Sequence, residues 1–359
     1  MFKIYQKYIL KKFLSKFFTV VLIFFCLSMV LNIFEEISFF KNSKANFILP
    51  YFLTILNAPI TLFEIFPFIF LISSQYFFYE LIKNDEMFVL KNNGLSNLKI
   101  INTLCISSIL MGLIIVLLFY NFSSKLKFIY TDIKNNYSND NKYLAVVNES
   151  GLWLKDETEK SILIVKSKNI EKNYLIDVVI NEFNFDFELK KTIQSNKIDI
   201  KNKNWIIYEA TVTLSNNTQI KFDKINLDTS FDSNKIRSLF SNYSTLNILQ
   251  LFNLKKDYEN LGYSSDEIEI HLLKIFISPY FYALMTVLAS IVMINVVKRS
   301  SIFFNIIFGV FISVVIYYIN FMFFSLGSTG KIPTEVSVFL PILFLTIITI
   351  IGLVRINEN

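Results

Sequence analysis

Six long apolar runs dominate the pattern of hydrophobic and polar positions along the chain. Each run has 18 or more residues and few charges, which is enough for a helix to cross a lipid bilayer. In chain order the runs are Phe17–Phe34, Ala45–Tyr79, Ile100–Ser124, Ile275–Val297, Ser300–Gly330 and Val336–Val354. A long polar insert separates the first three from the last three. The pattern therefore predicts a polytopic α-helical membrane protein with six transmembrane helices arranged 3+3.

The second run, Ala45–Tyr79, is too long for one straight span at 35 residues. We expect its beginning to lie along the outer membrane interface, and Pro50, Pro59 and Pro67 to bend the remainder. Glu64 also lies in this run, where an ionised side chain is costly in lipid. Glu64 is therefore expected either to face the bundle interior or an aqueous cavity, or to lie near the outer headgroups.

The polar insert, roughly Lys125–Ile270, changes to strand periodicity. Short β-rich runs alternate with Asn, Lys, Asp and Ser turns, which is typical of β-strands. The eight predicted strands are Tyr143–Val147, Gly151–Lys155, Ser161–Lys166, Tyr174–Ile180, Phe183–Leu189, Thr192–Ile200, Trp205–Leu214 and Thr218–Leu227. Their near-regular spacing favours a β-sandwich or jelly roll. The pattern becomes helical again from Leu246. We expect three parts: spans one to three (1–124), a β-domain (125–245), and a connecting helix with spans four to six (246–359).

Basic residues predict which side of the membrane each loop faces, because short cytoplasmic segments are enriched in Lys and Arg. With the N-terminus inside, the short inner segments hold eleven basic residues and the short outer segments hold three. The inner ones are Lys3, Lys7, Lys11, Lys12, Lys16, Lys83, Lys91, Lys99, Lys298, Arg299 and Arg355, and the outer ones are Lys41, Lys44 and Lys331. Both termini are therefore predicted to be cytoplasmic and the large insert to lie outside.

Composition narrows the chemistry that the chain supports. The residues are 53% hydrophobic and 18% charged, whereas a soluble domain carries nearer a quarter charged residues. The net charge of +6 belongs to the membrane topology and does not indicate nucleic acid. The single histidine, His271, argues against a His-rich metal site or a Ser-His-Asp triad. The motifs GxxxxGK[ST], GxSxG and HExxH are absent from the sequence. We therefore expect no enzyme, no cofactor and no metal site, and any ATP must be hydrolysed by a partner.

A short amphipathic segment, Lys83–Leu98, joins the second and third runs on the predicted cytoplasmic side. Asp85 is predicted to cap a helix that begins with Glu86, and Asn93-Gly94 is predicted to end it. Met87 and Leu90 then share one face. Such a helix is how a membrane subunit presents itself to a soluble partner; the alternative is an ordinary loop that lies on the headgroups.

Several motifs together resemble the lipopolysaccharide-export permease family LptF/LptG, and LptG more than LptF. The coupling segment of that family has an acid eight positions before a glycine, as Glu86 and Gly94 are here. Other matching features are Pro59 and Pro67 in the second span, Gly151-Leu-Trp-Leu-Lys-Asp156, Lys274-Ile-Phe with Pro279, and Lys331-Ile-Pro333 through Leu340-Pro341. Each motif is weak alone, but their order and spacing cover essentially the whole chain.

The resemblance implies a permease subunit that extracts lipopolysaccharide from the inner membrane. The implied partners are an LptF-like second permease subunit, an LptB-like ATPase dimer and periplasmic LptC- and LptA-like proteins that receive the lipid. The insert would be periplasmic. The implied ATPase-coupling residues are Asp85, Glu86, Met87, Leu90 and Gly94.

The resemblance also implies lipid contacts, with one departure from the family. A basic residue near the outer end of the first span contacts the headgroup in the family, and Asn32 stands there in this chain. Lys41 and Lys44 are the nearest basic residues that could replace it; otherwise the partner subunit supplies the contact or the headgroup carries less phosphate.

Two further sets of residues are assigned to the lipid path. The expected lateral gate or cavity residues are Leu31, Phe34, Glu64, Asn305 and Asn320. Inward-facing apolar positions of the β-domain are expected to shield the acyl chains, and those positions are Leu152, Ile164, Val179 and Ile206.

Two alternatives remain at the level of sequence. The first stays within transport: an LptF-type partner subunit, or another ABC permease with an extracytoplasmic domain. The second is a membrane-anchored sensor or assembly factor whose β-domain binds a ligand. Co-purification of a small ATPase would favour transport, because a sensor needs no such partner.

Overall fold

The computed structural model describes residues 3–41, 46–137, 152–157, 161–171, 173–215, 218–229, 231–233, 236, 242–260, 264–296 and 302–357. The chain forms two compact units. The first consists of residues Met1–Lys127 and Asp266–Asn359, and the second of residues Phe128–Ser265. Each unit is described separately below.

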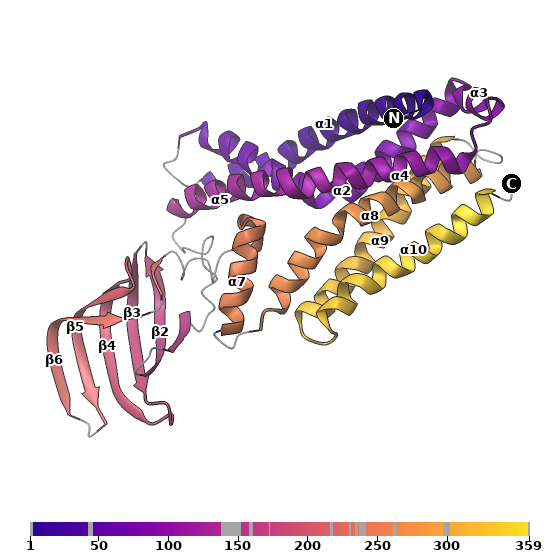
Figure 1. Ribbon diagram of the computed structural model, residues 1–359. Coiled ribbons are helices and arrows are strands. Elements are labelled where there is room, and N and C mark those ends of the chain that lie inside the picture. The colour runs from indigo at the N-terminus through magenta and orange to yellow at the C-terminus, as the bar shows by residue number, and fades with distance from the viewer. Residues whose placement is uncertain are drawn as a thin grey trace. The chain divides into compact units, whose positions relative to one another are not determined.

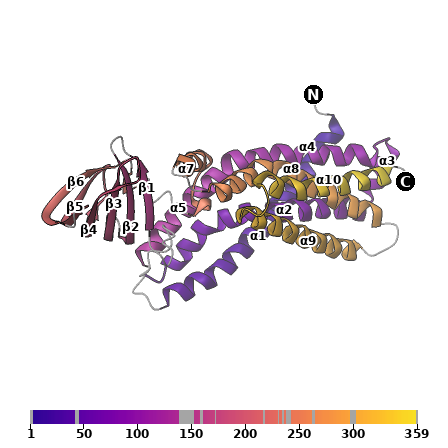
Figure 2. The same cartoon turned by 90° about the horizontal axis from the view of Figure 1, so that it is seen from below.

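The first unit is a bundle of long helices (Figures 1 and 2). Its elements are α1 (Ile4–Phe40), α2 (Leu49–Lys83), α3 (Glu86–Asn92), α4 (Asn97–Ile114), the π-helical stretch η1 (Ile115–Tyr120), the beginning of α5 (Asn121–Asn136), α8 (Asp266–Val296), α9 (Ile302–Ser328) and α10 (Thr334–Asn357). Six helical segments of the described chain are long and apolar enough to span a membrane. The predicted six-span architecture is thus confirmed.

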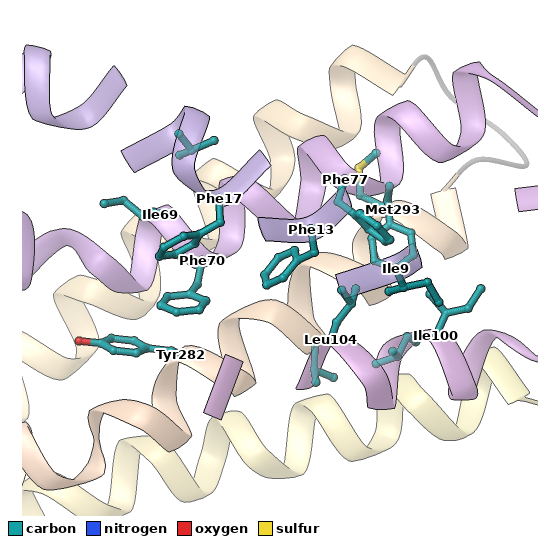
Figure 3. Close-up of a cluster of buried hydrophobic side chains, with 14 of the residues drawn as sticks. Ile9, Phe13, Phe17, Ile69, Phe70, Phe77, Ile100, Leu104, Tyr282 and Met293 are labelled. Atoms are coloured by element: carbon teal, nitrogen blue, oxygen red, sulfur yellow. The ribbon is translucent and has the colours of Figure 1, made fainter. Parts of the chain in front are cut away.

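Apolar side chains from helices distant in sequence form the core of this bundle (Figure 3). Phe13 and Phe17 of α1 pack against Phe77 and Phe70 of α2, with ring centroids 6.2 and 4.9 Å apart respectively. Phe70 in turn stacks on Tyr282 of α8, with centroids 4.9 Å apart and planes within 10°. Offset aromatic contacts of this kind stabilise a core beyond the area they bury. The bundle is therefore organised around α2, which touches both α1 and α8.

The second unit contains one antiparallel sheet of six described strands. They are β1 (Leu152–Glu157), β2 (Ile162–Glu171), β3 (Tyr174–Phe183), β4 (Leu189–Asp199), β5 (Asn204–Leu214) and β6 (Gln219–Asp228). The strands pair in sequence order, so the sheet is a meander. The short helix η2 (Tyr243–Thr245) and α7 (Ile248–Asn260) follow it. An inserted β-domain is confirmed, while the jelly-roll arrangement stays a prediction.

Six of the eight predicted strands correspond to β1–β6. The predicted strand Tyr143–Val147 lies outside the described residues. The predicted strand Phe183–Leu189 is wrong, because most of this segment is the turn between β3 and β4. The Asn184 side chain accepts the backbone N–H groups of Asp186 and Glu188, and Phe187 is left-handed with φ +60°. Asn side chains that bind nearby backbone groups favour turns over strands.

The sheet has one buried face, and three of the predicted inward residues do not lie on it. Leu152 is buried as expected. In contrast, Ile164, Val179 and Ile206 are half-buried, while their neighbours Leu163, Val165, Val178, Ile180, Trp205 and Ile207 are buried. Because strand side chains alternate between faces, the three residues lie on the opposite face. Trp153 is 47% exposed on that same outer face, and the Lys166 ammonium lies 4.9 Å from its ring centroid.

Candidate functional site

The segment between the second and third spans forms the short helix α3, which begins at Glu86 as predicted, but the predicted cap by the Asp85 side chain is wrong. Asp85 has a left-handed backbone with φ 57° and makes no side-chain cap. The predicted end is confirmed: α3 stops at Asn92, and Gly94 takes a left-handed φ of +79° while its N–H donates to the Lys91 carbonyl at 2.9 Å. Glycine adopts this conformation without the steric cost that a side chain adds. A sharp turn thus closes each end of α3.

The two sides of α3 differ in their contacts. Met87 and Leu90 are partly buried and pack against the bundle core. Phe88 and Val89 point away and are 66% and 55% exposed. Adjacent exposed apolar side chains mark a surface that contacts either a protein partner or the membrane. We call Phe88 and Val89 the apolar tip of α3.

The carboxylate of Glu86, at the start of α3, is held by the first helix. Its Oε2 accepts hydrogen bonds from the Tyr8 hydroxyl at 2.5 Å and the Lys12 ammonium at 2.6 Å, and its Oε1 accepts one from the Asn84 amide at 3.3 Å. Burial raises the pKa of Glu86, but the hydrogen bonds from Lys12, Tyr8 and Asn84 outweigh burial and bring the pKa below its ordinary value. Glu86 is therefore ionised and already engaged within the chain.

The ion pairs continue from α3 onto α2. The Lys12 ammonium also lies 3.4 Å from the Glu80 carboxylate, and Lys16 forms a second ion pair with Glu80. The Lys16 ammonium lies 4.7 Å from the ring centroid of Tyr76. Ion pairs thus join α1 to α2 and α3, which follow it in the chain. They involve four charged side chains: Lys12, Lys16, Glu80 and Glu86. We call these four residues the charge cluster. Sequence reasoning missed it, because lysines near a membrane end indicate orientation and not a partner.

A second set of hydrogen-bonded polar side chains connects α1, α2 and α5. The Asn32 amide donates to the Ser28 hydroxyl, and the Asn57 amide donates to the Asn32 oxygen, both at 3.2 Å. The Lys127 ammonium donates to the Asn57 oxygen at 2.7 Å. Asn32, which occupies the expected headgroup position, is therefore connected to a basic residue through Asn57. Lys41 is exposed, and Lys44 lies outside the described residues.

The Glu64 side chain, on α2, is exposed in this chain. The charges of Lys274 on α8 and Lys127 on α5 act on its carboxylate, and the Lys274 ammonium lies 4.3 Å from the ring centroid of Phe324. Two cations near one carboxylate satisfy the requirement that an acid in a membrane span has opposite charge nearby. Sequence reasoning had placed Lys127 in the insert and had not connected it with Glu64.

The expected gate residues divide into two groups. Leu31 and Phe34 on α1 are 65% and 68% exposed, whereas Asn305 and Asn320 on α9 are 0% and 8% exposed and pack within this chain. The backbone carbonyl of Asn305 accepts a hydrogen bond from the Gln75 amide of α2 at 3.2 Å. The apolar windows of α1 and α9 are each only 17% buried, compared with 72% for α8. The exposed apolar faces of α1 and α9 are thus available to lipid or to another subunit.

The family model of the lipopolysaccharide export system permease LptF/LptG matches residues 7–355, nearly the whole chain. No curated protein matches the chain. The match spans all six membrane helices, α3 and the six-stranded sheet. The chain belongs to the LptF/LptG family of lipopolysaccharide export permeases.

Proposed function

We propose that the chain is the LptG-type permease subunit of an ATP-driven exporter that extracts lipopolysaccharide from the inner membrane. The family match over residues 7–355 carries this proposal. An LptF-type subunit is the alternative within the same family. A membrane-anchored sensor is disfavoured, because six spans arranged 3+3 exceed what an anchor needs.

The lipid path is proposed to form between this chain and a second permease subunit. An amphiphile with several acyl chains needs an apolar surface that opens sideways to the bilayer. The two least covered spans, α1 and α9, offer such surfaces. We place α1 of this chain against the fifth span of the partner, and α9 of this chain against the partner's first span. Leu31 and Phe34 then face the gate, while Asn305 and Asn320 stabilise α9 from behind.

The orientation is proposed to follow the positive-inside rule. The beginning of α1, the end of α10 and α3 lie at the same end of the helical unit in both views (Figures 1 and 2). The described basic residues that were predicted to be cytoplasmic belong to α1, α10 and the segment around α3, whereas Lys298 and Arg299 lie outside the described residues. A soluble LptB-like ATPase would therefore meet α3 at that end. The β-domain would be periplasmic and pass lipid to LptC- and LptA-like proteins. At the outer end Asn32, Lys41 and Lys127 are the candidates for headgroup contact.

The test is a crosslink at the proposed gate. Cysteines at Leu31 and in the fifth span of the partner should form a disulfide that stops lipid loading and spares basal ATP hydrolysis. Cysteine at Ile307, exposed on α9 of this chain, should likewise crosslink to the partner's first span. A crosslinked complex that loads lipid at the normal rate would refute this gate. A chain that brings down neither a second permease nor an ATPase would refute the exporter role.

A further inference from the structure

The outer face of the β-domain sheet, the side opposite its buried residues, carries three aromatic rings that are each paired with a lysine. The ammonium groups lie 4.9, 4.0 and 5.5 Å from the ring centroids, in the pairs Lys166–Trp153, Lys197–Tyr174 and Lys224–Tyr208. The rings are on β1, β3 and β5 and the lysines are on β2, β4 and β6, so the pairs extend across the whole described sheet. We call them the ring–lysine pairs.

Strand register places the three pairs on this face, because residues that are opposite each other in a ladder point to the same side of a sheet. One row of opposite residues is Trp153, Lys166, Val179, Gln194, Thr211 and Lys221. A second row is Ile176, Lys197, Tyr208 and Lys224. Val179 belongs to the outer face, and Tyr208 directly follows the buried Ile207. Tyr174 likewise directly precedes the buried Leu175. Both rows and all three rings therefore point outward.

The two rows hold four lysines and no acid. These lysines, all of them exposed, are Lys166, Lys197, Lys221 and Lys224. Asp177 and Glu209 lie between the rows, but Asp177 pairs with Lys168 at 3.7 Å. Within the part of the chain that the structure describes, no ion pair neutralises any of the four lysines. A face that meets only water usually intersperses charges of both signs. The four ammonium groups thus suit an anionic ligand.

Aromatic rings and ammonium groups side by side match the chemistry of an acidic sugar. The C–H groups of a sugar ring carry a partial positive charge and stack on the negative face of an aromatic ring. A carboxylate or phosphate on the same sugar then meets the neighbouring ammonium. Sugar hydroxyls can exchange hydrogen bonds with the side chains of Gln194 and Thr211, which are opposite each other in the first row. An acyl chain is a poor match, because it would have to cover charged groups.

Lysine stems also lie over aromatic rings on sheets that bind nothing, where they cover apolar surface. Two features of this face go beyond that. Trp153 remains 47% exposed beside its lysine, so part of the ring is open to a ligand. Lys197 and Lys224 flank Tyr208 on its two neighbouring strands, roughly 10 Å from each other at the usual strand spacing. Cations on both sides of one ring suit a chain of sugars that carries several acidic groups.

We propose that the outer face of the sheet binds the acidic oligosaccharide of lipopolysaccharide. This inference rests on the proposed function, in which the chain handles lipopolysaccharide and the β-domain lies outside the membrane. Lipopolysaccharide is an amphiphile whose acidic groups are attached to its sugars, so charge complementarity selects the sugar end and not the acyl chains. The face then makes the chain favour lipids with an acidic glycan.

The two tryptophans of the chain provide the measurement. Trp153 lies on the outer face, whereas Trp205 is 1% exposed in the core of the β-domain. The probe is the lipid-free core oligosaccharide released from lipopolysaccharide, titrated into the purified full chain in detergent micelles. It should change the tryptophan emission saturably, and Trp153→Phe should abolish the change. A neutral dextran oligosaccharide of the same length should bind more weakly, because it lacks acidic groups.

Matched double variants remove the same charge from two parts of the β-domain. Lys166→Gln with Lys197→Gln should weaken binding of the core oligosaccharide by about tenfold, the size expected for the loss of two exposed ionic contacts. Lys201→Gln with Lys203→Gln, in the exposed turn between β4 and β5, is the control and should bind like the unaltered chain. Binding should also weaken as the salt concentration rises to about 150 mM, because salt screens exposed charges.

The outcomes separate this inference from its alternatives and from the exporter role. Equal affinity in the two double variants, or an emission that does not change, would overturn the proposal. A response to phosphatidylglycerol added to the micelles, but not to the oligosaccharide, would also overturn it and assign the face to the membrane surface. A working exporter that binds no oligosaccharide would overturn this inference alone. A chain that binds the oligosaccharide but brings down no ATPase would instead refute the exporter role and leave the binding face standing.

Discussion

Replacement of Gly112 by alanine should destabilise the helical unit, because the backbone of α8 lies close to α4 at Gly112. A Cβ atom at this position would lie 2.7 Å from the Pro279 Cα, 2.9 Å from the Pro279 Cβ and 3.1 Å from a ring carbon of Tyr282. The nearest atom belongs to the backbone of α8, so no side-chain rotation relieves the clash. The two helices must separate, and Tyr282, which stacks on Phe70, must shift with them.

The size of the effect follows from two opposing terms. Overpacking a filled core costs about 1–3 kcal/mol, and a backbone contact belongs at the upper end of that range. Alanine gains up to about 1 kcal/mol over glycine in a helix interior. The net loss for Gly112→Ala is therefore about 1–2 kcal/mol in the free energy of unfolding.

Gly352→Ala is the matched control. Its Cβ atom would lie 2.7 Å from the Cδ1 of Ile291, the far end of a flexible side chain. The Cγ2 of Ile291 would lie 3.0 Å away, so this side chain must shift slightly, but both contacts are with side-chain atoms and not with the backbone. The helix-propensity gain then offsets most of the cost, and the loss is smaller than for Gly112→Ala. The assay is unfolding of each purified variant in detergent micelles, monitored by circular dichroism against denaturant. If Gly112→Ala is as stable as Gly352→Ala, the close approach of α4 and α8 carries no energetic weight and the reasoning is refuted.

Four other outcomes are expected. Val165→Asn, at a buried position, should lower the free energy of unfolding of the β-domain by about 2–4 kcal/mol, whereas Ile164→Asn on the outer face should lower it by less than about 1 kcal/mol. Denaturant unfolding measures both, and equal losses would contradict the assignment of faces. Phe88→Ser should weaken ATPase co-purification about tenfold while coupling per bound ATPase is unchanged. Because the pKa of Glu86 is lowered, its pairing should persist above the ordinary carboxylate value of 4.5 and be lost as pH falls through the lowered pKa, seen as a lower hydrogen-exchange protection factor in α3 relative to the intrinsic exchange rate at each pH. A protection factor in α3 that does not change with pH would show that the Glu86 charge does not hold the helix. Gly309→Ala should displace Gln75, whose amide occupies the space of the new Cβ, and loosen α2 from α9, seen as a lower unfolding midpoint.

The hydrophobic pattern determined the membrane-spanning elements. Apolar runs of 18 or more residues are stable in lipid only as helices, because every backbone group must be satisfied within the segment. This constraint is local, so all six spans were found from the sequence, along with the existence of a strand-rich insert. The turn that ends α3 just before Gly94 was also predictable, because its left-handed conformation favours glycine.

The faces of the strands were not predictable, because they depend on tertiary packing. The misassigned residues Ile164, Val179 and Ile206 each lie in a run of consecutive apolar residues, so alternation gives no sign of which one points inward. The backbone adds a second reason. Asp177 and Glu209 have left-handed φ values of 50° and 49°. Each of them interrupts the alternation of side chains, so that the residues after it exchange faces. The spacing of buried residues there becomes three instead of two, as from Leu175 to Val178 and from Ile207 to Ala210.

The candidate site divides in the same way. The sequence singled out Glu86 and Asn32 as individual residues from their positions along the chain. It could not show that Lys12 pairs with Glu86 across 74 residues, or that Lys127 reaches Asn57 across 70 residues. These contacts arise where helices distant in sequence pack together. The secondary-structure propensity of each residue does not indicate how far apart the two side chains lie in the folded protein. The sequence alone therefore determined which segments cross the membrane and which form strands, and the tertiary structure decided which charges meet and what they connect.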